Sequence, residues 1–329
     1  MRRPLAAPAV LLTLALLLAA CAHAGRPAAH APTPAPPARS PGAAVGMRTM
    51  TFTDTSRVTD PTPNHPGDET RGRTLVTTVW YPAAGDPGPV RTGAAPAGGG
   101  PFPVVVFSHG LLGVPSDYQA LATRWASAGL VVVAPAYPLT NRGSSHVQAL
   151  DVPNQPADAS FVLSALLQLA ASPGDPFHGL LDAGRVAAAG HSAGAITTVG
   201  LFTACCRDAR LRSGIVLAGN SLGFGGGYSG RAVPLLFEHG DQDPIVPYAT
   251  GRLTWDGVPW PKAFVTLEGE GHIDPYLQPG NRAFPVVAAT TTDFLRWTLT
   301  GDRSSLAALR RDAAVTGLAR MDDRLAQTP

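Results

Sequence analysis

Short apolar runs alternate with amphipathic segments along most of this chain, and this alternation limits the fold more than any other feature. The runs FPVVVF and LVVVA contain no charged residue, as in strands that are buried on both faces of a parallel sheet. We expect strands at residues 46–54, 72–82, 102–110, 130–138, 185–192, 212–219, 232–240 and 262–269, and helices at residues 115–129, 157–172, 193–205 and 284–299. The first two strands are expected to form an antiparallel edge. Strands that alternate with helices predict an α/β fold, with a mostly parallel central sheet and helices on both of its faces.

The start of the chain has the layout of a secretory signal. Arg2 and Arg3 precede an apolar run that ends in small residues and Cys21. This ending resembles a bacterial lipobox, in which the signal is cut before the cysteine and the sulfur carries lipid, and the run is short for a membrane span. We therefore predict a signal peptide at residues 1–20 and an exported lipoprotein, anchored through Cys21 on the cell surface or in the periplasm. A signal cut elsewhere and an uncut anchor are the alternatives.

The next segment, residues 21–46, is rich in Ala and Pro and poor in large apolar side chains. Such a segment cannot bury enough surface to fold, so we interpret it as a tether. Residues 47–329 then form one large α/β domain. The formal net charge is only +2, and no run of Lys and Arg is interleaved with aromatic residues, so we expect no nucleic acid partner.

The sequence GHSAG at residues 190–194 falls where an apolar strand turns into a helix. This is the context of a nucleophile elbow, whose flanking glycines let strand and helix approach closely. Ser192 is the candidate nucleophile, and the alternative is a glycine-rich turn with no catalytic role. We expect the backbone N–H groups of Ala193 and Leu111 to hold the oxyanion, because Leu111 lies in the loop after an earlier strand. His109, in the same loop, is expected to shape the turn.

An acid and a histidine should follow such a serine in that order. Asp243 lies just after an expected strand and is the candidate acid, whose carboxylate would hold the imidazole in the right tautomer. Asp241 is the alternative acid, and its other role is to cap the turn. His272 lies in a loop between glycines, past the last expected strand, and is the candidate general base.

The segments VWYP, FPVVVFSHG, GHSAG, HGDQDPIVP and GHIDPY occur in that order, and with them the chain from about Arg73 to Leu299 resembles an α/β-hydrolase. Asp243 resembles the acid of the D-x-x-V-P segment in that fold. Within the superfamily the chain is similar to an exported branch that includes dienelactone-hydrolase-like, chlorophyllase-like and platelet-activating-factor acetylhydrolase-like esterases and bacterial polyester hydrolases. It departs from dienelactone hydrolases proper, which have a cysteine where Ser192 stands, and it lacks the H-G-G-G signature of another lipase branch.

This resemblance implies an exported serine hydrolase that cleaves carboxylic esters through an acyl-enzyme, without a metal or an organic cofactor. Its substrates would be short- to medium-chain or bulky esters, polymeric ones included. Two other functions use the same fold. One is a peptidase or amidase with the same triad, and assays on matched ester and amide substrates would distinguish it from an esterase. A non-catalytic surface binding protein is the other, and the retention of Ser192, Asp243 and His272 argues against it.

Several smaller features leave alternatives open. Cys205 and Cys206 are adjacent, and they form either a strained disulfide or two buried thiols. The glycine-rich segment at residues 223–230 does not complete G-x-G-x-x-G, and we expect a flexible loop over the site. Trp255 and Trp260 either border the pocket or pack in the core.

The loops and the tail give three further expectations. The segment between Gly219 and Val233 is too short and too glycine-rich for a helical lid, so the site should be open, without a large lid. Loops such as residues 140–153 are expected to shape the acyl and alcohol pockets. Residues 304–325 carry apolar side chains at helical spacing and are expected to form a peripheral helix.

Replacement of Cys21 by Ser is expected to abolish lipid attachment and to leave catalysis unchanged, because the tether separates the anchor from the domain. Metabolic labelling with a fatty acid measures the attachment, and hydrolysis of a soluble ester by the same preparations is the control. Equal labelling of the wild type and the variant would contradict the lipid anchor.

Overall fold

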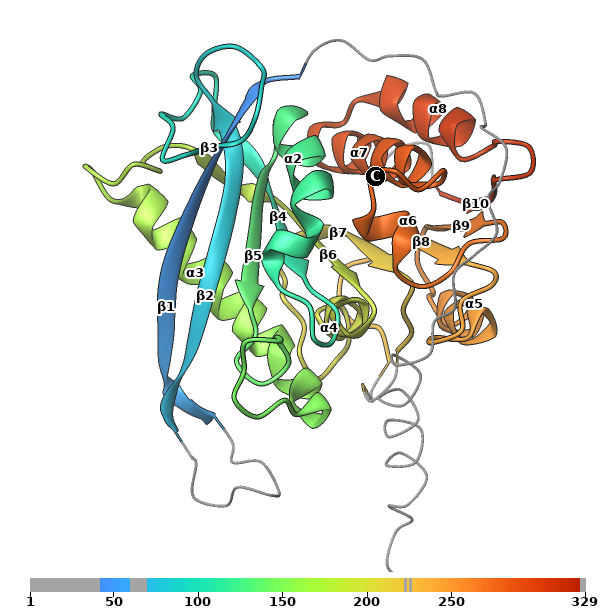
Figure 1. The fold of residues 1–329 in the computed structure, drawn as a ribbon, viewed down its shortest axis with the longest axis horizontal. Coiled ribbons are helices and arrows are strands. Elements are labelled where there is room, and N and C mark those ends of the chain that lie inside the picture. Colours follow the sequence, from blue (N-terminus) through green and yellow to red (C-terminus); the bar gives the residue numbers. More distant parts are fainter. Residues whose placement is uncertain (1–41, 60–69, 222–223, 225–226, 326–329) are drawn as a thin grey trace, which may run out of the picture.

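The computed structural model describes residues 42–59, 70–221, 224 and 227–325, which form a ten-stranded sheet with helices on both faces (Figure 1). The strand order is β10-β9-β8-β7-β6-β4-β5-β2-β1-β3, and the six central strands from β9 to β5 run parallel to one another. The predicted α/β fold with a mostly parallel sheet is therefore confirmed. The predicted signal peptide, Cys21 and most of the predicted tether lie outside the described residues.

The parallel strands form the buried centre of the domain. They are β4 (Phe102–Ser108), β5 (Val131–Ala136), β6 (Leu181–His191), β7 (Leu211–Leu217), β8 (Leu235–Gly240) and β9 (Lys262–Leu267). Along β4, Val105 and Phe107 face one layer of helices, and Val104 and Val106 face the other. Burial on both faces explains why these strands read as continuous apolar runs instead of alternating patterns.

A long antiparallel hairpin of β1 (Ala44–Thr59) and β2 (Thr70–Ala83) extends the sheet on one side, with the short β3 (Arg91–Thr92) beyond it (Figure 1). The strand β1 begins at Ala44, before the domain boundary predicted at residue 47. The reason is backbone pairing: Ala44 pairs with Ala83, and the Ala43 N–H donates to the Ser127 carbonyl at 2.8 Å.

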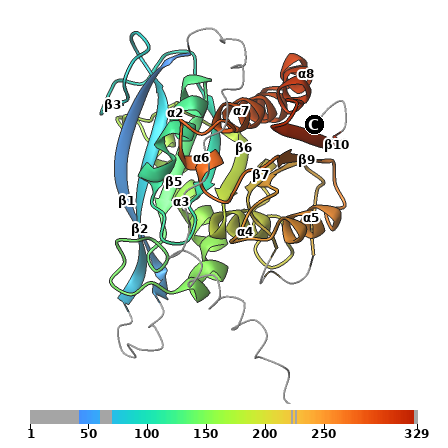
Figure 2. The same ribbon diagram turned by 45° about the vertical axis from the view of Figure 1, so that its right-hand side comes forward.

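Helices cover both faces of the sheet (Figures 1 and 2). One layer contains η1 (Pro115–Tyr118), α2 (Gln119–Ser127), α6 (Asp274–Leu277), α7 (Phe284–Thr300) and α8 (Arg303–Asp312). The other layer contains α3 (Gln155–Ala171), preceded directly by η2 (Ala149–Asn154), and α4 (Ala193–Gly200) and α5 (Tyr248–Asp256). Within the described part of the chain, every helix is too short or too polar to cross a membrane.

The C-terminal tail is not the single peripheral helix that the sequence predicts. The helix α8 ends at Asp312, and Ala319–Arg324 form β10, which pairs antiparallel with β9. Pairing with β9 satisfies the backbone groups of what would otherwise be an open sheet edge. The sequence ARMDDR is mostly polar because an edge strand needs backbone pairing more than buried side chains.

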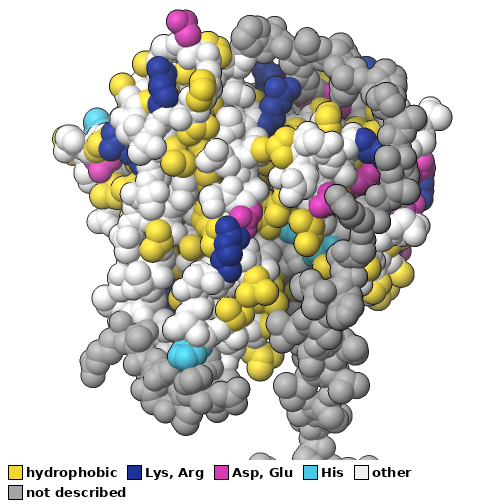
Figure 3. Space-filling view, viewed as in Figure 1, with side chains coloured by type: hydrophobic (Ala, Val, Ile, Leu, Met, Phe, Trp, Pro, Cys, Tyr) yellow, Lys and Arg dark blue, Asp and Glu magenta, His cyan; other side chains and the backbone are white. Residues whose placement is uncertain are grey.

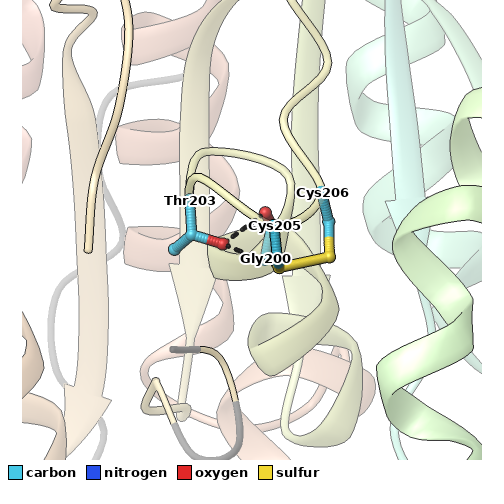
Figure 4. Close-up of a disulfide and its surroundings, with 4 residues drawn as sticks. All are labelled: Gly200, Thr203, Cys205 and Cys206. Atoms are coloured by element: carbon cyan, nitrogen blue, oxygen red, sulfur yellow. Dashed lines mark hydrogen bonds between the residues drawn. A yellow bond between two sulfur atoms is a disulfide. The ribbon is translucent and has the colours of Figure 1, made fainter. Parts of the chain in front are cut away.

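The predicted helix at residues 193–205 is shorter than expected, since α4 ends at Gly200. A turn follows, in which the Thr203 hydroxyl donates to the Gly200 carbonyl at 2.8 Å and lies 3.3 Å from Cys205 Sγ. Cys205 and Cys206 form a disulfide in this turn (Figure 4). Cys205 is exposed, so the alternative of two buried thiols does not hold.

A buried ion-pair network ties β2 to the segment before α3. Arg73 donates to both carboxylate oxygens of Asp151 and of Asp158, at distances of 2.7 to 3.0 Å. Asp158 Oδ1 also accepts a hydrogen bond from Arg57 Nη2, at 2.6 Å. Buried carboxylates are costly without such partners, so the network fixes η2 and the start of α3 against the hairpin.

Glu238 on β8 is fully buried beneath α7. Its Oε1 accepts a hydrogen bond from the Thr290 hydroxyl at 2.5 Å, and its Oε2 has no hydrogen-bond partner among the described residues. Burial raises the pKa of Glu238 to about 8. The carboxyl is therefore protonated in the folded protein at neutral pH.

We expect the wild type to lose stability relative to Glu238→Gln as the pH rises from 5 to 8. In the unfolded chain this carboxyl ionises near its ordinary pKa of 4.5, whereas the folded protein keeps the proton up to about pH 8. Folding of the wild type must then take up a proton in this window, whereas folding of Glu238→Gln does not. The unfolding free energy of the wild type should therefore fall relative to that of the variant by up to about 1.4 kcal/mol per pH unit. Urea denaturation of both proteins at the two pH values measures it. A difference that does not change with pH would contradict the raised pKa.

Candidate active site

Three of the predicted side chains meet at the carboxyl-terminal edge of the parallel strands. Ser192 follows β6, Asp243 follows β8, and His272 follows β9. Ser192 Oγ lies 2.8 Å from His272 Nε2, and His272 Nδ1 lies 2.7 Å from Asp243 Oδ2. The serine hydroxyl can donate to Nε2 while the Nδ1–H group donates to the carboxylate. This arrangement allows the imidazole to take the serine proton.

The turn at Ser192 leaves no room for side chains on its flanking glycines. A Cβ atom on Gly190 would lie 2.1 Å from the Gly194 carbonyl oxygen, and one on Gly194 would lie 2.0 Å from the Ser108 carbonyl oxygen. Ser192 itself has a φ of 56°, in the left-handed region that non-glycine residues rarely adopt. Such strain is typical of a turn that presents its side chain outward from the sheet.

Asp243 is held as a carboxylate by several donors. Its Oδ1 accepts the backbone N–H groups of Ile245 and Val246, both at 2.8 Å, and its Oδ2 accepts His272 Nδ1. Burial alone would raise the pKa of Asp243, but the hydrogen bonds from His239, His272 and the backbone hold this pKa well below its ordinary value. The alternative acid, Asp241, accepts the Gly269 N–H at 2.8 Å instead, which is the turn-capping role predicted for it.

His239 is a functional candidate that the sequence interpretation missed. It is buried at the end of β8, and its Nε2 lies 3.1 Å from Asp243 Oδ2 and 2.9 Å from the Val246 carbonyl oxygen. Because a carbonyl can only accept, Nε2 carries the proton and also donates to the carboxylate. His239 precedes the acid by four residues, and this spacing alone does not reveal the contact, since it depends on how the loop folds back.

The loop after β4 lies against the nucleophile. A Cβ atom on Gly110 would be 3.2 Å from Ser192 Cβ, so Gly110, the residue before Leu111, lies beside the serine. Among the hydrogen bonds between described residues, neither the Leu111 N–H nor the Ala193 N–H has an acceptor. Leu112 has a φ of 61°, and its N–H donates to the Thr140 carbonyl at 2.7 Å. Two backbone donors are thus available next to the serine, as an oxyanion hole requires.

His109 is a buried residue of this loop and not a second base. Its Nδ1 donates to the Gly110 carbonyl at 2.7 Å, and its Nε2 accepts the Tyr137 N–H at 3.0 Å. Burial lowers the pKa of His109 to about 4, so the ring is neutral and can make both bonds. It joins the loop after β4 to the end of β5, in agreement with the turn-shaping role expected for it.

The two tryptophans between the acid and the base pack in the core or near it. Trp255 is fully buried, and its ring centroid lies 6.0 Å from that of Phe264. Trp260 contacts the rings of Phe202 and Tyr228, at centroid distances of 6.3 and 5.4 Å. The packing alternative therefore holds for Trp255.

The glycine-rich segment lies partly outside the described residues, and its described part does not cover the site. The Phe224 ring packs against Gly200, where a Cβ atom would be 2.6 Å from it. Tyr228 forms a β-bridge with Thr203. Both contacts lie at the end of α4 opposite Ser192.

Exposed apolar side chains follow two of the candidate site residues in the sequence. Leu112 follows the candidate oxyanion donor and is 39% exposed, and Ile273 follows the candidate base and is 42% exposed. Figure 3 shows one face of the molecule, on which hydrophobic side chains lie in several patches between polar and charged ones. The segment predicted to shape the pockets contains η2 and presents two further apolar residues to solvent, Val147 and Leu150.

Comparisons with known proteins agree with this fold. The sequence profile of the chlorophyllase family matches residues 80–212, a range that includes Leu111, Ser192 and Ala193 but ends before Asp243 and His272. None of the curated proteins compared matches the chain. A solved structure of a ferulic acid esterase from Streptomyces cinnamoneus is similar, with a TM-score of 0.60 and 23% identity over 78% of this chain and 91% of that chain. The predicted resemblance to α/β-hydrolases, and to the chlorophyllase-like members among them, is confirmed.

Asp243→Asn should lower kcat by about four orders of magnitude, because a carboxamide no longer fixes the imidazole tautomer. Asp241→Asn is the matched control. Its carboxylate accepts the Gly269 N–H and, at 3.4 Å, Gln242 Nε2, and has no hydrogen bond to His272 among the described residues, so this variant should keep most of the activity. Initial rates on one soluble ester, with circular dichroism as a check of folding, compare the two. If Asp241→Asn were the more damaging change, the acid would be wrongly assigned.

Proposed function

We propose that this chain is a chlorophyllase-like α/β-hydrolase that cleaves carboxylic esters, with Ser192 as nucleophile, His272 as general base and Asp243 as acid. The observation that carries the proposal is the continuous hydrogen-bonded line from Asp243 through His272 to Ser192. It lies beside two backbone N–H groups that have no acceptor among the described residues. A buried line of this kind would have little structural value by itself, since each polar group must be desolvated.

The geometry supports a two-stage reaction. His272 takes the proton of the Ser192 hydroxyl as the oxygen attacks the ester carbonyl, and the Leu111 and Ala193 N–H groups receive the negative charge on the carbonyl oxygen. His272 then gives the proton to the departing alcohol, which leaves an acyl group on Ser192. Water, activated by the same imidazole, attacks the acyl-enzyme, releases the acid and restores the serine. No step requires a metal or an organic cofactor.

The surroundings of the serine favour esters with an apolar group near the reacting carbonyl. Leu112 follows the proposed oxyanion donor and Ile273 follows the proposed base in the sequence; both are exposed and would lose water on contact with an acyl chain or an aromatic ring. The structural neighbour is a ferulic acid esterase by name, which supports an ester as the bond cleaved. We place short- to medium-chain and bulky esters in the substrate range, with polymeric esters as members of the same class.

The proposed cellular location rests on the sequence alone. The signal-like start, Cys21 and the Ala/Pro-rich tether support an exported lipoprotein, whose domain hydrolyses esters outside the cytoplasm. A tether of this composition would let the domain reach substrates at some distance from the membrane.

Ser192→Ala is expected to leave a folded protein whose ester hydrolysis is reduced by about three or more orders of magnitude. A chain-length series of aryl esters, with the matching aryl amides, measures the activity of both proteins. A fluorophosphonate probe should label the wild type and not the variant. Amide cleavage at rates comparable to those of the esters would favour a peptidase or amidase, and an unlabelled, inactive wild type would favour a binding protein.

A further inference from the structure

A buried hydrogen-bonded relay joins the three loops that carry the proposed reacting groups. The Gly110 N–H lies 3.0 Å from Tyr118 Oη, and Tyr118 Oη lies 2.8 Å from His191 Nδ1. His191 Nε2 lies 2.7 Å from the backbone carbonyl oxygen of His272. Gly110 directly precedes Leu111, and His191 directly precedes Ser192. The relay therefore includes His272 itself and lies one residue from Leu111 and from Ser192.

The direction of each hydrogen bond in the relay is fixed by its two ends. The Gly110 N–H can only donate, and the His272 carbonyl can only accept, so His191 Nε2 carries a proton. Burial lowers the pKa of His191 to about 3, so the ring is neutral and its Nδ1 has a free lone pair. The Tyr118 hydroxyl must then donate to Nδ1 while it accepts from Gly110. No other assignment satisfies all the groups.

Burial makes each bond of the relay consequential. Tyr118 is 3% exposed and His191 is 3% exposed, so water cannot replace a missing partner. The His191 ring also packs against His272, at a centroid distance of 4.8 Å, and against Tyr276 at 5.0 Å. His191 thus contacts the proposed base in two ways, through a hydrogen bond to the backbone carbonyl of His272 and through packing against the His272 ring.

We infer that Tyr118 and His191 are positioning residues, which set the Leu111 N–H and the His272 imidazole in place relative to Ser192. This inference rests on the proposed function. Tyr118 lies in η1, outside every segment by which the sequence indicated a hydrolase, and His191 is the variable second residue of GHSAG. The relay gives both of them a part in the reaction without contact to the substrate.

The test compares two buried tyrosines whose hydroxyl groups have different hydrogen-bond partners. Tyr118→Phe removes the middle oxygen of the relay. Tyr137→Phe is the matched control, because Tyr137 is also buried and, among the described residues, its hydroxyl binds the Ser108 hydroxyl alone, at 2.8 Å. Both variants should lose stability, since each leaves a buried polar group without its partner. Only Tyr118→Phe should lower kcat, by ~10- to 100-fold, with a change in KM below about threefold.

An alkyl boronic acid, which forms a tetrahedral adduct on a serine hydroxyl, reports the oxyanion site directly. In Tyr118→Phe its inhibition constant should rise by about the same factor by which kcat/KM falls, because transition-state analogues measure the same stabilisation. In Tyr137→Phe it should not change. Equal kcat and equal boronate affinity in the two variants would overturn the inference, since the hydroxyl of Tyr118 would then be merely structural.

A double-mutant cycle tests whether the relay acts as one unit. His191→Gln keeps a donor near the position of Nε2 for the His272 carbonyl and has no acceptor at the position of Nδ1 for Tyr118. Adding it to Tyr118→Phe should therefore cost little more than the worse single variant. Additive losses would overturn the relay. If His191→Gln does not fold, the comparison of Tyr118→Phe with Tyr137→Phe by itself decides whether the inference holds. A wild type that neither hydrolyses esters nor binds the boronate would instead reject the proposed function.

Discussion

The close approach of three backbones at Ser192 is the constraint on which the rest of the site depends. The glycines on either side of the serine allow β6, α4 and the end of β4 to come within contact of one another, at distances that no Cβ atom could tolerate. The Ser192 N–H donates to the Leu217 carbonyl at 2.9 Å, which ties the turn to the neighbouring strand β7 as well. Among the described residues, those with a positive φ that are not glycine are Leu112, Ser192 and Ala218. They follow the carboxyl ends of β4, β6 and β7. Strain is thus concentrated where the loops must converge, and the packed sheet below them sustains it.

Buried imidazoles join these loops to one another through hydrogen bonds. A neutral imidazole offers one donor and one acceptor in a rigid plane, so it can join two backbone segments that do not belong to one strand or helix. His109 joins the loop after β4 to the end of β5, and His191 joins the η1 tyrosine to the loop of His272. His239 adds a donor to the carboxylate of Asp243. Each ring is rigid and is buried with its partners, so the loops gain order at a small cost in side-chain entropy.

The sequence predicts the fold and the order of the site residues well, because both depend on local patterns. Apolar runs mark the parallel strands, and GHSAG at a strand-to-helix junction marks the elbow. What it does not predict depends on contacts between distant segments. The strand β10 carries no apolar pattern of its own and exists because β9 presents an open edge. The hydrogen bond from His239 to Asp243 and the link between Tyr118 and His191 join side chains whose proximity only the folded loops create.

The segment at residues 140–153 shows how such a site can keep its catalytic geometry while its pocket changes. At one end, the Thr140 carbonyl accepts the Leu112 N–H. At the other, Gln155 donates to the Thr140 hydroxyl at 2.7 Å and accepts the Thr197 hydroxyl of α4, so the two ends of the segment are joined to each other and to the elbow helix. The ion pair from Arg73 then fixes Asp151 within it. Between these anchors the chain reaches the surface and exposes its apolar side chains. The anchors therefore fix the loop after β4 relative to α4. Between them, Arg142 donates to the Asp117 carboxylate, which accepts the Val114 N–H of the same loop, whereas Val147 and Leu150 are exposed.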